Sequence, residues 1–246
     1  MALLQVTDVG YSFGNQQVFD DVNFSISARE FVALAGPNGA GKTTLMELLL
    51  GIRTLTSGTV TLSEELRSGR SLRIGYVPQR PAVSEDLVMT VEELVGTGRL
   101  ATKSFWRPLH AADRSAVAHA IESVGLATQR TAQVGSLSGG QLQRAFIAKA
   151  FAADPLLLVL DEPVAGVDPE SQQQFRDALM HLLREHGAAV LLVSHELGAV
   201  ARDLDRVIVL RQRIVFDGPP EDLEARGVHL GIHDEDLPRW LEGPQT

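Results

Sequence analysis

Cysteine is absent from the 246 residues of this chain. Disulfide frameworks, zinc sites built from thiolates and cysteine nucleophiles are therefore excluded. Long apolar runs are also missing, since no stretch approaches the roughly 18 residues that would suggest a membrane-spanning helix. The opening segment, Met1–Asp8, lacks the basic region and apolar core of a secretory signal. We therefore expect any role at a membrane to depend on a partner protein.

Positive charge is in short supply as well. Lys and Arg number 22 against 31 Asp and Glu, which gives a formal net charge of −9. A nucleic-acid backbone as the main ligand would favour a basic surface, so we expect no nucleic acid among the partners. Hydrophobic residues make up 44% of the chain, which is enough to bury a sizeable core. The length fits one large α/β domain or two small ones, without internal repeats.

Strand-like and helix-like segments alternate along the chain, which is typical of an α/β fold. A turn at Gly14–Asn15 separates the first two strands and indicates an antiparallel start. The runs 156–160 and 188–193 are continuously apolar, as in strands buried on both faces of a parallel sheet. Residues from 80 to about 132 have a helical pattern and form an insert. The expected strands are 3–9, 18–26, 31–35, 59–62, 73–77, 156–160, 188–193, 207–210 and 213–216, and the expected helices are 42–50, 90–96, 111–124, 140–152 and 169–186.

A glycine-rich segment follows the apolar strand 31–35 and precedes the first helix. Glycines let backbone N–H groups approach the phosphates of a nucleotide, and the following helix directs its positive end at them. Lys42 is expected to reach the β- and γ-phosphates, and the Thr43 hydroxyl to ligate Mg²⁺. A chance match is expected in about one chain in a hundred of this length, and the flanking strand and helix argue against chance. The residues that match the pattern G-x-x-x-x-G-K-[ST] are Gly36, Pro37, Asn38, Gly39, Ala40, Gly41, Lys42 and Thr43.

Two carboxylates end the apolar strand 156–160. Asp161 and Glu162 form the Walker B arrangement of P-loop NTPases, in which Asp161 holds Mg²⁺ and Glu162 polarises the attacking water. An apolar strand ending in Asp-Glu is, by itself, equally compatible with a structural role. Together with the glycine-rich loop, the pair predicts a P-loop NTPase.

The segment 137–141, with the sequence LSGGQ, narrows the family. It resembles the signature motif of ABC ATPases and lies, as in that family, between the Q-loop and Walker B. The motif offers a hydroxyl, two glycines and a helix N-terminus, which together form a second phosphate cradle. An ordinary helix N-cap would explain Ser138 but neither Gly139 nor Gly140.

The resemblance to ABC ATPases extends from residue 3 to about 220 and implies roles for further residues. Gln79 resembles the Q-loop glutamine that senses Mg²⁺ and the γ-phosphate, and His195 resembles the switch histidine. Phe13 stands where the family has an aromatic residue that stacks on adenine, with Tyr11 as the competing choice. The implied nucleotide-binding residues are Phe13, Gly36, Pro37, Asn38, Gly39, Ala40, Gly41, Lys42, Thr43, Thr44, Gln79, Ser138, Gly139, Gly140, Gln141 and Asp168 of the D-loop; the implied catalytic residues are Glu162, His195 and Lys42, and the implied Mg²⁺ ligands are Thr43, Gln79 and Asp161.

The resemblance also implies a fold, partners and a location. It implies a P-loop NTPase core with a mainly parallel sheet, an N-terminal antiparallel β subdomain and a helical insert that carries the signature. One ABC ATPase domain would span 1–220, with a helical subdomain at about 80–150, followed by an acidic extension at 221–246. ABC ATPases pair head-to-tail with ATP between the two chains. We therefore expect a homodimer that hydrolyses ATP with Mg²⁺, bound to permease subunits at the cytoplasmic face of the cell membrane and working indirectly with a substrate-binding protein.

The substrate and the acidic tail leave alternatives open. Residues 73–80, 90–91 and 96–99 look like the importer branch for zinc or manganese, with iron chelates or another substrate as the alternative. A non-transport ABC ATPase is disfavoured because the chain has a single cassette and no coiled-coil arm. In the tail, His229 and His233 with their acidic neighbours permit a metal-sensing role, although a solvated acidic tail is the simpler interpretation.

Overall fold

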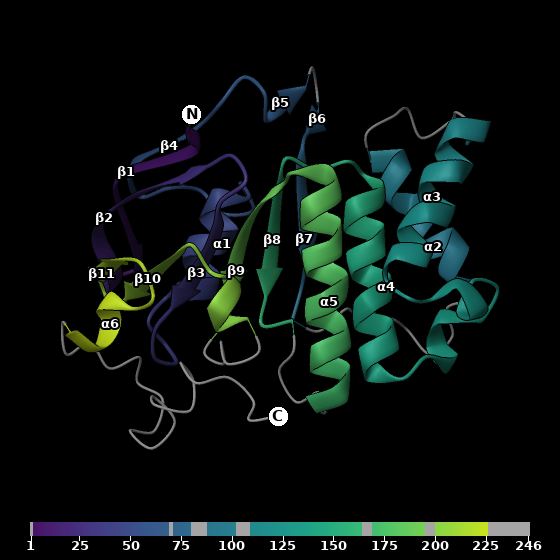
Figure 1. The fold of residues 1–246 in the computed structure, drawn as a ribbon. Coiled ribbons are helices and arrows are strands. Elements are labelled where there is room, and N and C mark those ends of the chain that lie inside the picture. Colours follow the sequence, from purple (N-terminus) through teal and green to yellow (C-terminus); the bar gives the residue numbers. More distant parts are fainter. Residues whose placement is uncertain are drawn as a thin grey trace. The chain divides into compact units, whose positions relative to one another are not determined.

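The computed structural model describes residues 2–68, 71–79, 88–101, 109–163, 169–194 and 200–225. The chain forms two compact units. The first unit comprises Met1–Glu64 and Ala189–Thr246, and the second comprises Glu65–Ala188. Figure 1 shows that both combine strands and helices, and the mainly parallel strand pairing with a separate antiparallel sheet confirms the predicted α/β class.

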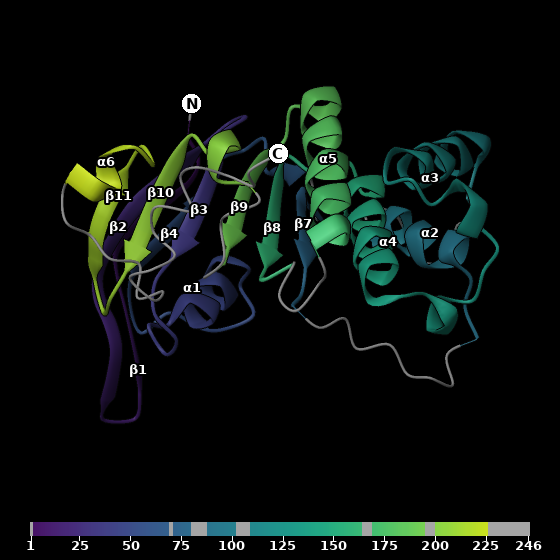
Figure 2. The same cartoon turned by 60° about the horizontal axis from the view of Figure 1, so that its bottom comes forward.

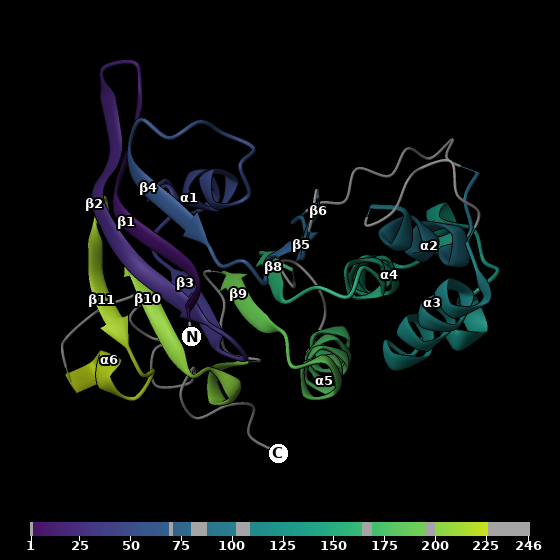
Figure 3. The ribbon, with the colours of Figure 1, turned by 90° about the horizontal axis from the view of Figure 1, so that it is seen from above.

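The first unit contains a three-stranded antiparallel sheet in the order β2-β1-β4, seen in Figure 3. Its strands are β1 (Ala2–Phe13), β2 (Gln16–Ser27) and β4 (Ser57–Leu62). The first two form a hairpin that pairs Phe13 with Gln16, and Gly14 adopts a φ of 56° in the predicted turn. Both strands extend beyond the predicted ranges, because exposed residues near the hairpin tip also pair although they lack an apolar pattern.

A second set of strands in the first unit lies in the order β11-β10-β3-β9, visible in Figure 2, and β10, β3 and β9 among them are parallel. All residues of β3 (Phe31–Ala35) and β9 (Ala189–Val193) are buried, which explains their continuous apolar sequences. Strand β11 (Ile214–Gly218) runs antiparallel to β10 (Arg206–Leu210) and is the edge strand on this side. Helix α1 (Lys42–Leu49) follows β3 and buries its apolar residues, whereas α6 (Asp222–Ala225) and the 3₁₀ helix Ala201–Asp203 are short connecting elements.

The second unit pairs β7 (Ile74–Val77) with β8 (Leu157–Asp161) in parallel. A hairpin of two-residue strands, β5 (Arg67–Ser68) and β6 (Ser71–Leu72), precedes them and was not predicted, because so short a segment has no resolvable period. The helices are α2 (Val91–Ala101), α3 (Ala111–Ser123), α4 (Gly139–Ala152) and α5 (Pro169–His186), with 3₁₀ turns at Ala127–Gln129 and Val134–Ser136.

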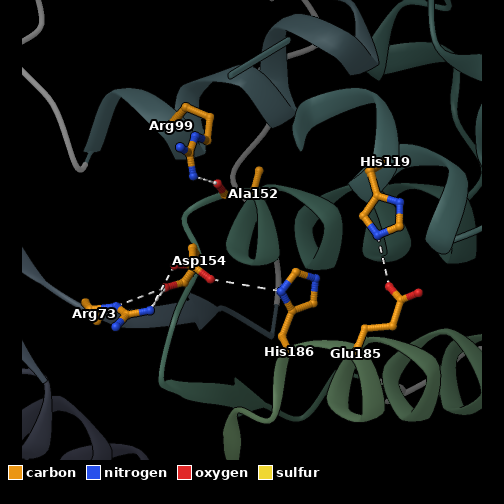
Figure 4. Close-up of polar contacts among 7 residues, drawn as sticks. All are labelled: Arg73, Arg99, His119, Ala152, Asp154, Glu185 and His186. Carbon is orange, nitrogen blue, oxygen red and sulfur yellow. Dashed lines mark hydrogen bonds and ion pairs between the residues drawn. The ribbon is translucent and has the colours of Figure 1, made fainter. Parts of the chain in front are cut away.

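Helix α4 is central to the second unit and packs against α2, α3, α5 and β7. A Cβ on Gly98 of α2 would lie 2.1 Å from the carbonyl oxygen of Lys149, so α2 and α4 approach at backbone contact. Arg99 then donates to the carbonyl oxygen of Ala152 at 2.9 Å, as Figure 4 shows. The same side chain pairs at 3.1 Å with Asp113 of α3, which is fully buried. These contacts hold α2 and α3 against α4, the helix that begins with the signature segment.

Candidate functional site

The glycine-rich loop between β3 and α1 adopts backbone conformations that residues with side chains rarely adopt. Its φ is 146° at Gly36 and 91° at Gly41. A Cβ on Gly36 would lie 2.3 Å from the carbonyl oxygen of Leu210 in β10. A Cβ on Gly41 would lie 2.7 Å from the side chains of Val18 and Phe19 in β2. Only glycine fits at both positions, so packing within the first unit fixes the path of the loop.

Lys42 begins α1, and its ammonium group lies within the loop. Its Nζ donates to the carbonyl oxygens of Gly36 at 2.7 Å and Pro37 at 3.1 Å, and the residue is only 7% exposed. The N-cap residue, Gly41, offers no side chain to the first amides of α1, and the first turn contains no acidic residue. The helix start therefore combines a buried cation with amides that no side chain caps, an arrangement suited to phosphate.

Two aromatic side chains near the end of β1 were rival candidates for stacking on adenine. Phe13 is 49% exposed, and Tyr11 contacts its ring edge-to-face at a centroid distance of 5.0 Å. Tyr11 also lies near the ring of the buried Phe19, at 6.3 Å. The guanidinium of Arg53 lies 5.3 Å from the Phe13 centroid, and its hydrogen bond with Glu47 raises the pKa of Arg53 above the usual value. Phe13 thus offers the more accessible ring.

In the second unit, β7 and β8 end side by side and deliver polar side chains to one place. Val77 pairs with Leu160, so Gln79 and the two carboxylates follow the same ends of neighbouring strands. Gln79 Nε2 donates to Glu162 Oε2 at 2.5 Å. Asp161 is the last residue of β8 and is 6% exposed. The oxygen atoms of these side chains are ligands that Mg²⁺ accepts.

Glu162 has a left-handed backbone, with a φ of 43°. In a residue with a Cβ this conformation costs on the order of 1 to 3 kcal/mol and persists only where the surroundings enforce it. Glu162 directly follows the fully buried β8, and the chain turns there. Five other described residues with a Cβ, among them Asp8 and Arg29, also have a positive φ, so this conformation alone does not mark a functional site. The hydrogen bond from Gln79 is the observation that supports a chemical role for the Glu162 carboxylate.

The signature segment forms the start of α4 in the second unit. Ser138 is the N-cap, and its Oγ accepts from the backbone N–H of Gln141 at 3.3 Å. The Gln141 Oε1 accepts in return from the backbone N–H of Ser138 at 3.0 Å, which completes a capping box. A Cβ on Gly139 would meet nothing within 4 Å, so packing within this chain does not require glycine there. The sequence analysis missed the structural role of Gln141, although the S-x-x-Q spacing signals it.

Several predicted residues lie outside the described part of the chain. They are Asp168 in the D-loop segment 165–168, His195, and the tail histidines His229 and His233. The structure does bring Gln79 to Glu162, and it places the loop 36–43 as a unit at the start of α1. Among the described residues, no helix combines the length and apolarity needed to cross a membrane.

Comparison with known proteins identifies the family. A family model described as ABC transporter matches residues 19–165. The zinc transport system ATP-binding protein of Streptococcus pneumoniae is 39% identical over 211 residues, which cover 85% of this chain and 90% of the relative. The manganese transport system ATP-binding protein of Halalkalibacterium halodurans is 34% identical over 221 residues, covering 90% and 88%.

Solved structures agree with this assignment. An ATP-binding subunit of an ABC transporter superposes with a TM-score of 0.76 at 26% identity, covering 98% of each chain. A nucleotide-free ATP-binding cassette gives a TM-score of 0.78 at 24% identity, covering 93% of this chain and 96% of the other, and supports the fold. The chain belongs to the ABC transporter family, as one of its ATP-binding and ATP-hydrolysing subunits.

Proposed function

We propose that this chain energises the import of a divalent metal ion, zinc or manganese, through permease subunits encoded separately. The observation that carries the substrate is the set of relatives at 34% to 39% identity over 85% to 90% of the chain, whose names specify zinc or manganese transport. The ATPase assignment follows independently from the family and the motifs. We further propose one ABC ATPase domain over 1–220, with a helical subdomain at about 80–150 and an acidic extension at 221–246.

ATP binding begins, in this proposal, at the start of α1. The carbonyl oxygens of Gly36 and Pro37 now accept from Lys42 Nζ, and phosphate oxygens would replace them as stronger, charged acceptors. The amides that lead into α1, from Gly39 to Thr44, would donate to the phosphates. Phe13 would stack on adenine, because its ring is accessible whereas Tyr11 lies against two other rings.

Mg²⁺ and the attacking water would be handled by oxygen-bearing side chains. We propose Thr43, Gln79 and Asp161 as the Mg²⁺ ligands, an oxygen-only set that fits this ion. Bound Mg²⁺ would neutralise charge on the β- and γ-phosphates. The Glu162 carboxylate would accept a proton from water or orient it, and the Gln79 amide, which donates to Oε2, would hold that carboxylate in position. We also propose that His195 acts as the switch histidine at the γ-phosphate and that Asp168 of the D-loop binds the nucleotide.

We propose that two copies of this chain share two ATP molecules. The first turn of α4 presents Ser138 and Gly139 to solvent, without an acidic residue. Such an end suits the γ-phosphate of an ATP held by the loop of another copy. The permease subunits would dock on residues 79 to about 107 and hold the homodimer at the cytoplasmic face of the membrane. Charge reversal at Arg80 or Glu85, which lie outside the described residues, should then reduce transport more than the basal ATPase rate.

Transport by the complete complex tests the substrate. The chain should be purified as a complex with its permease subunits and placed in vesicles with the matching binding protein. We expect ATP-dependent uptake of zinc or manganese that is lost when Glu162→Gln replaces the wild-type chain. Uptake of an iron chelate with no response to either metal ion would contradict the proposed substrate while leaving the ATPase assignment intact.

A further inference from the structure

Three potential metal ligands meet on the surface of the second unit, at a place with no assigned role. His119 belongs to α3, and Glu185 and His186 end α5. Their ligand atoms all lie within 4.8 Å of one another. Figure 4 shows the His119 ring directed at the Glu185 carboxylate across the space between the two helices. We propose that His119, Glu185 and His186 form a binding site for a divalent transition-metal ion of the zinc type.

The Glu185 carboxylate is the centre of this cluster. Its Oε2 lies 2.9 Å from His119 Nε2, and its Oε1 lies 3.5 Å from His181 Nε2 one helical turn away. Each carboxylate oxygen therefore already faces an imidazole nitrogen. His186 is held by packing, because its ring lies 5.6 Å from that of Phe151. Packing of this kind limits the rotation that a ligand side chain must give up when it binds a metal ion.

Asp154 supports the site from the other side of His186. Its Oδ1 lies 4.0 Å from His186 Nδ1, and its Oδ2 accepts from Arg73 at 2.9 Å. At 4.0 Å the separation from His186 is too long for a hydrogen bond, so Asp154 places a negative charge near the His186 ring and does not fix its orientation. Figure 4 shows this chain of contacts from Arg73 through Asp154 to His186. The candidate ligands thus have a charged neighbour in Asp154, which Arg73 holds by an ion pair.

The ligand chemistry selects the class of ion. Two imidazole nitrogens and one carboxylate form a set that Zn²⁺ takes from proteins, with water in the fourth position. With Zn²⁺–ligand distances of about 2.0 to 2.1 Å, the ligand atoms of a tetrahedral site lie roughly 3.3 to 3.4 Å apart. The observed separations, from 2.9 Å to at most 4.8 Å, bracket this value, and the side chains are exposed enough to adjust. Mg²⁺ and Ca²⁺ prefer all-oxygen sets and are disfavoured.

The position of the cluster at the C-terminal end of α5 adds an electrostatic field that favours a bound cation. The C-terminal end of a helix carries partial negative charge, which stabilises a cation there. Bound metal would also join α3 to the end of α5, two segments far apart in sequence. The proposal uses no residue assigned to ATP and does not depend on which substrate is transported.

Titration of the full-length, nucleotide-free chain with ZnCl₂ by calorimetry, in excess Mg²⁺, tests the site. We expect the wild type to bind one Zn²⁺ per chain at this site. The double variant His119→Ala/His186→Ala should bind Zn²⁺ at least about 10-fold more weakly, because the loss of residues that support a metal site has an effect of this size. Glu185→Gln keeps an oxygen that can accept from His119 but removes the charge, and it should weaken binding similarly. The matched control, His229→Ala/His233→Ala, removes two histidines of the tail and should retain this affinity.

Hydrogen exchange separates a metal site from a mere surface hydrogen bond. With Zn²⁺, the amides of α3 and of the last turn of α5 should exchange more slowly in the wild type and in the tail variant. In Glu185→Gln, the exchange rates of the same amides should not change when Zn²⁺ is added. Zn²⁺ binding that is equal in all variants, or absent from the wild type, would overturn the proposal. Loss of binding only in the tail variant would overturn it too.

Discussion

The two glycine-bearing helix starts of this chain, at α1 and at α4, look alike in sequence but satisfy their amides differently. At α1, Gly41 supplies no cap and Lys42 adds a buried positive charge. At α4, the side chains of Ser138 and Gln141 cap the helix reciprocally, and the exposed start carries no cation. The first start is equipped to capture a triphosphate alone.

The second start is stable without any ligand, since its own side chains complete it. A Cβ on its exposed Gly139 would meet no atom of the described residues within 4 Å, so we attribute the glycine there to the close approach of another molecule. This contrast is what a site shared between two chains requires: one chain binds ATP, and the other approaches it.

Ser138→Arg should abolish ATP turnover and leave ATP binding by the isolated chain unchanged. A bulky cation at this exposed position would block the approach of a second copy without touching the loop 36–43. Steady-state ATPase assays and calorimetry measure the two effects. Ser115→Arg, the same change at an exposed position of α3, is the control and should preserve both. Loss of ATP binding by monomeric Ser138→Arg would show that the signature acts within one chain.

Glu162→Gln should lower turnover by about 10²- to 10⁴-fold, as expected for the loss of a general base. ATP should still bind, and the loss of one negative charge near the γ-phosphates should make an ATP-dependent dimer visible by size-exclusion chromatography. Glu170→Gln at the start of α5 is the matched control and should behave as the wild type. A wild-type rate in Glu162→Gln, with no dimer, would exclude Glu162 as the catalytic carboxylate.

Lys42→Ala should weaken ATP binding by roughly 10- to 150-fold, because a hydrogen bond to a charged group contributes about 1.5 to 3 kcal/mol. Calorimetry with ATP measures the change. Lys149→Ala on α4 removes a lysine whose ammonium lies over the Phe146 ring and should leave ATP affinity unchanged. Near-wild-type affinity in Lys42→Ala would mean that the loop does not depend on its lysine.

Gly36→Ala and Gly139→Ala should change stability in opposite directions. At Gly36 the added Cβ would collide with the Leu210 carbonyl oxygen, so we expect a loss on the order of 1 to 3 kcal/mol. At Gly139, the first residue of α4, the Cβ enters open space and the backbone is compatible with alanine, so we expect a gain of about 0.4 to 1 kcal/mol together with reduced turnover. Urea unfolding and ATPase assays measure both. A Gly139→Ala variant with full turnover would remove the functional reason for that glycine.

Much of the fold followed from local patterns. The buried strands 31–35, 156–160 and 188–193 were predicted because strands covered on both faces are continuously apolar, and the turn at Gly14 because its residues favour the conformation. The hairpin β5–β6 and the polar tip of the first hairpin were missed, because their pairing leaves no apolar period. Of the candidate site, the loop 36–43 and the pair Asp161–Glu162 were chosen from spacing alone.

Residue types and their short-range order were enough to indicate the family that the chain resembles, the residues that can hold phosphate and the strands that must be buried. Only the tertiary structure decided why Gly36 and Gly41 cannot be replaced, since the atoms that forbid a side chain come from β10 and β2. Only folding likewise placed Gln79 on Glu162 and His119 on Glu185. These partners lie more than sixty residues apart along the chain, so no sequence pattern of short period records that they meet.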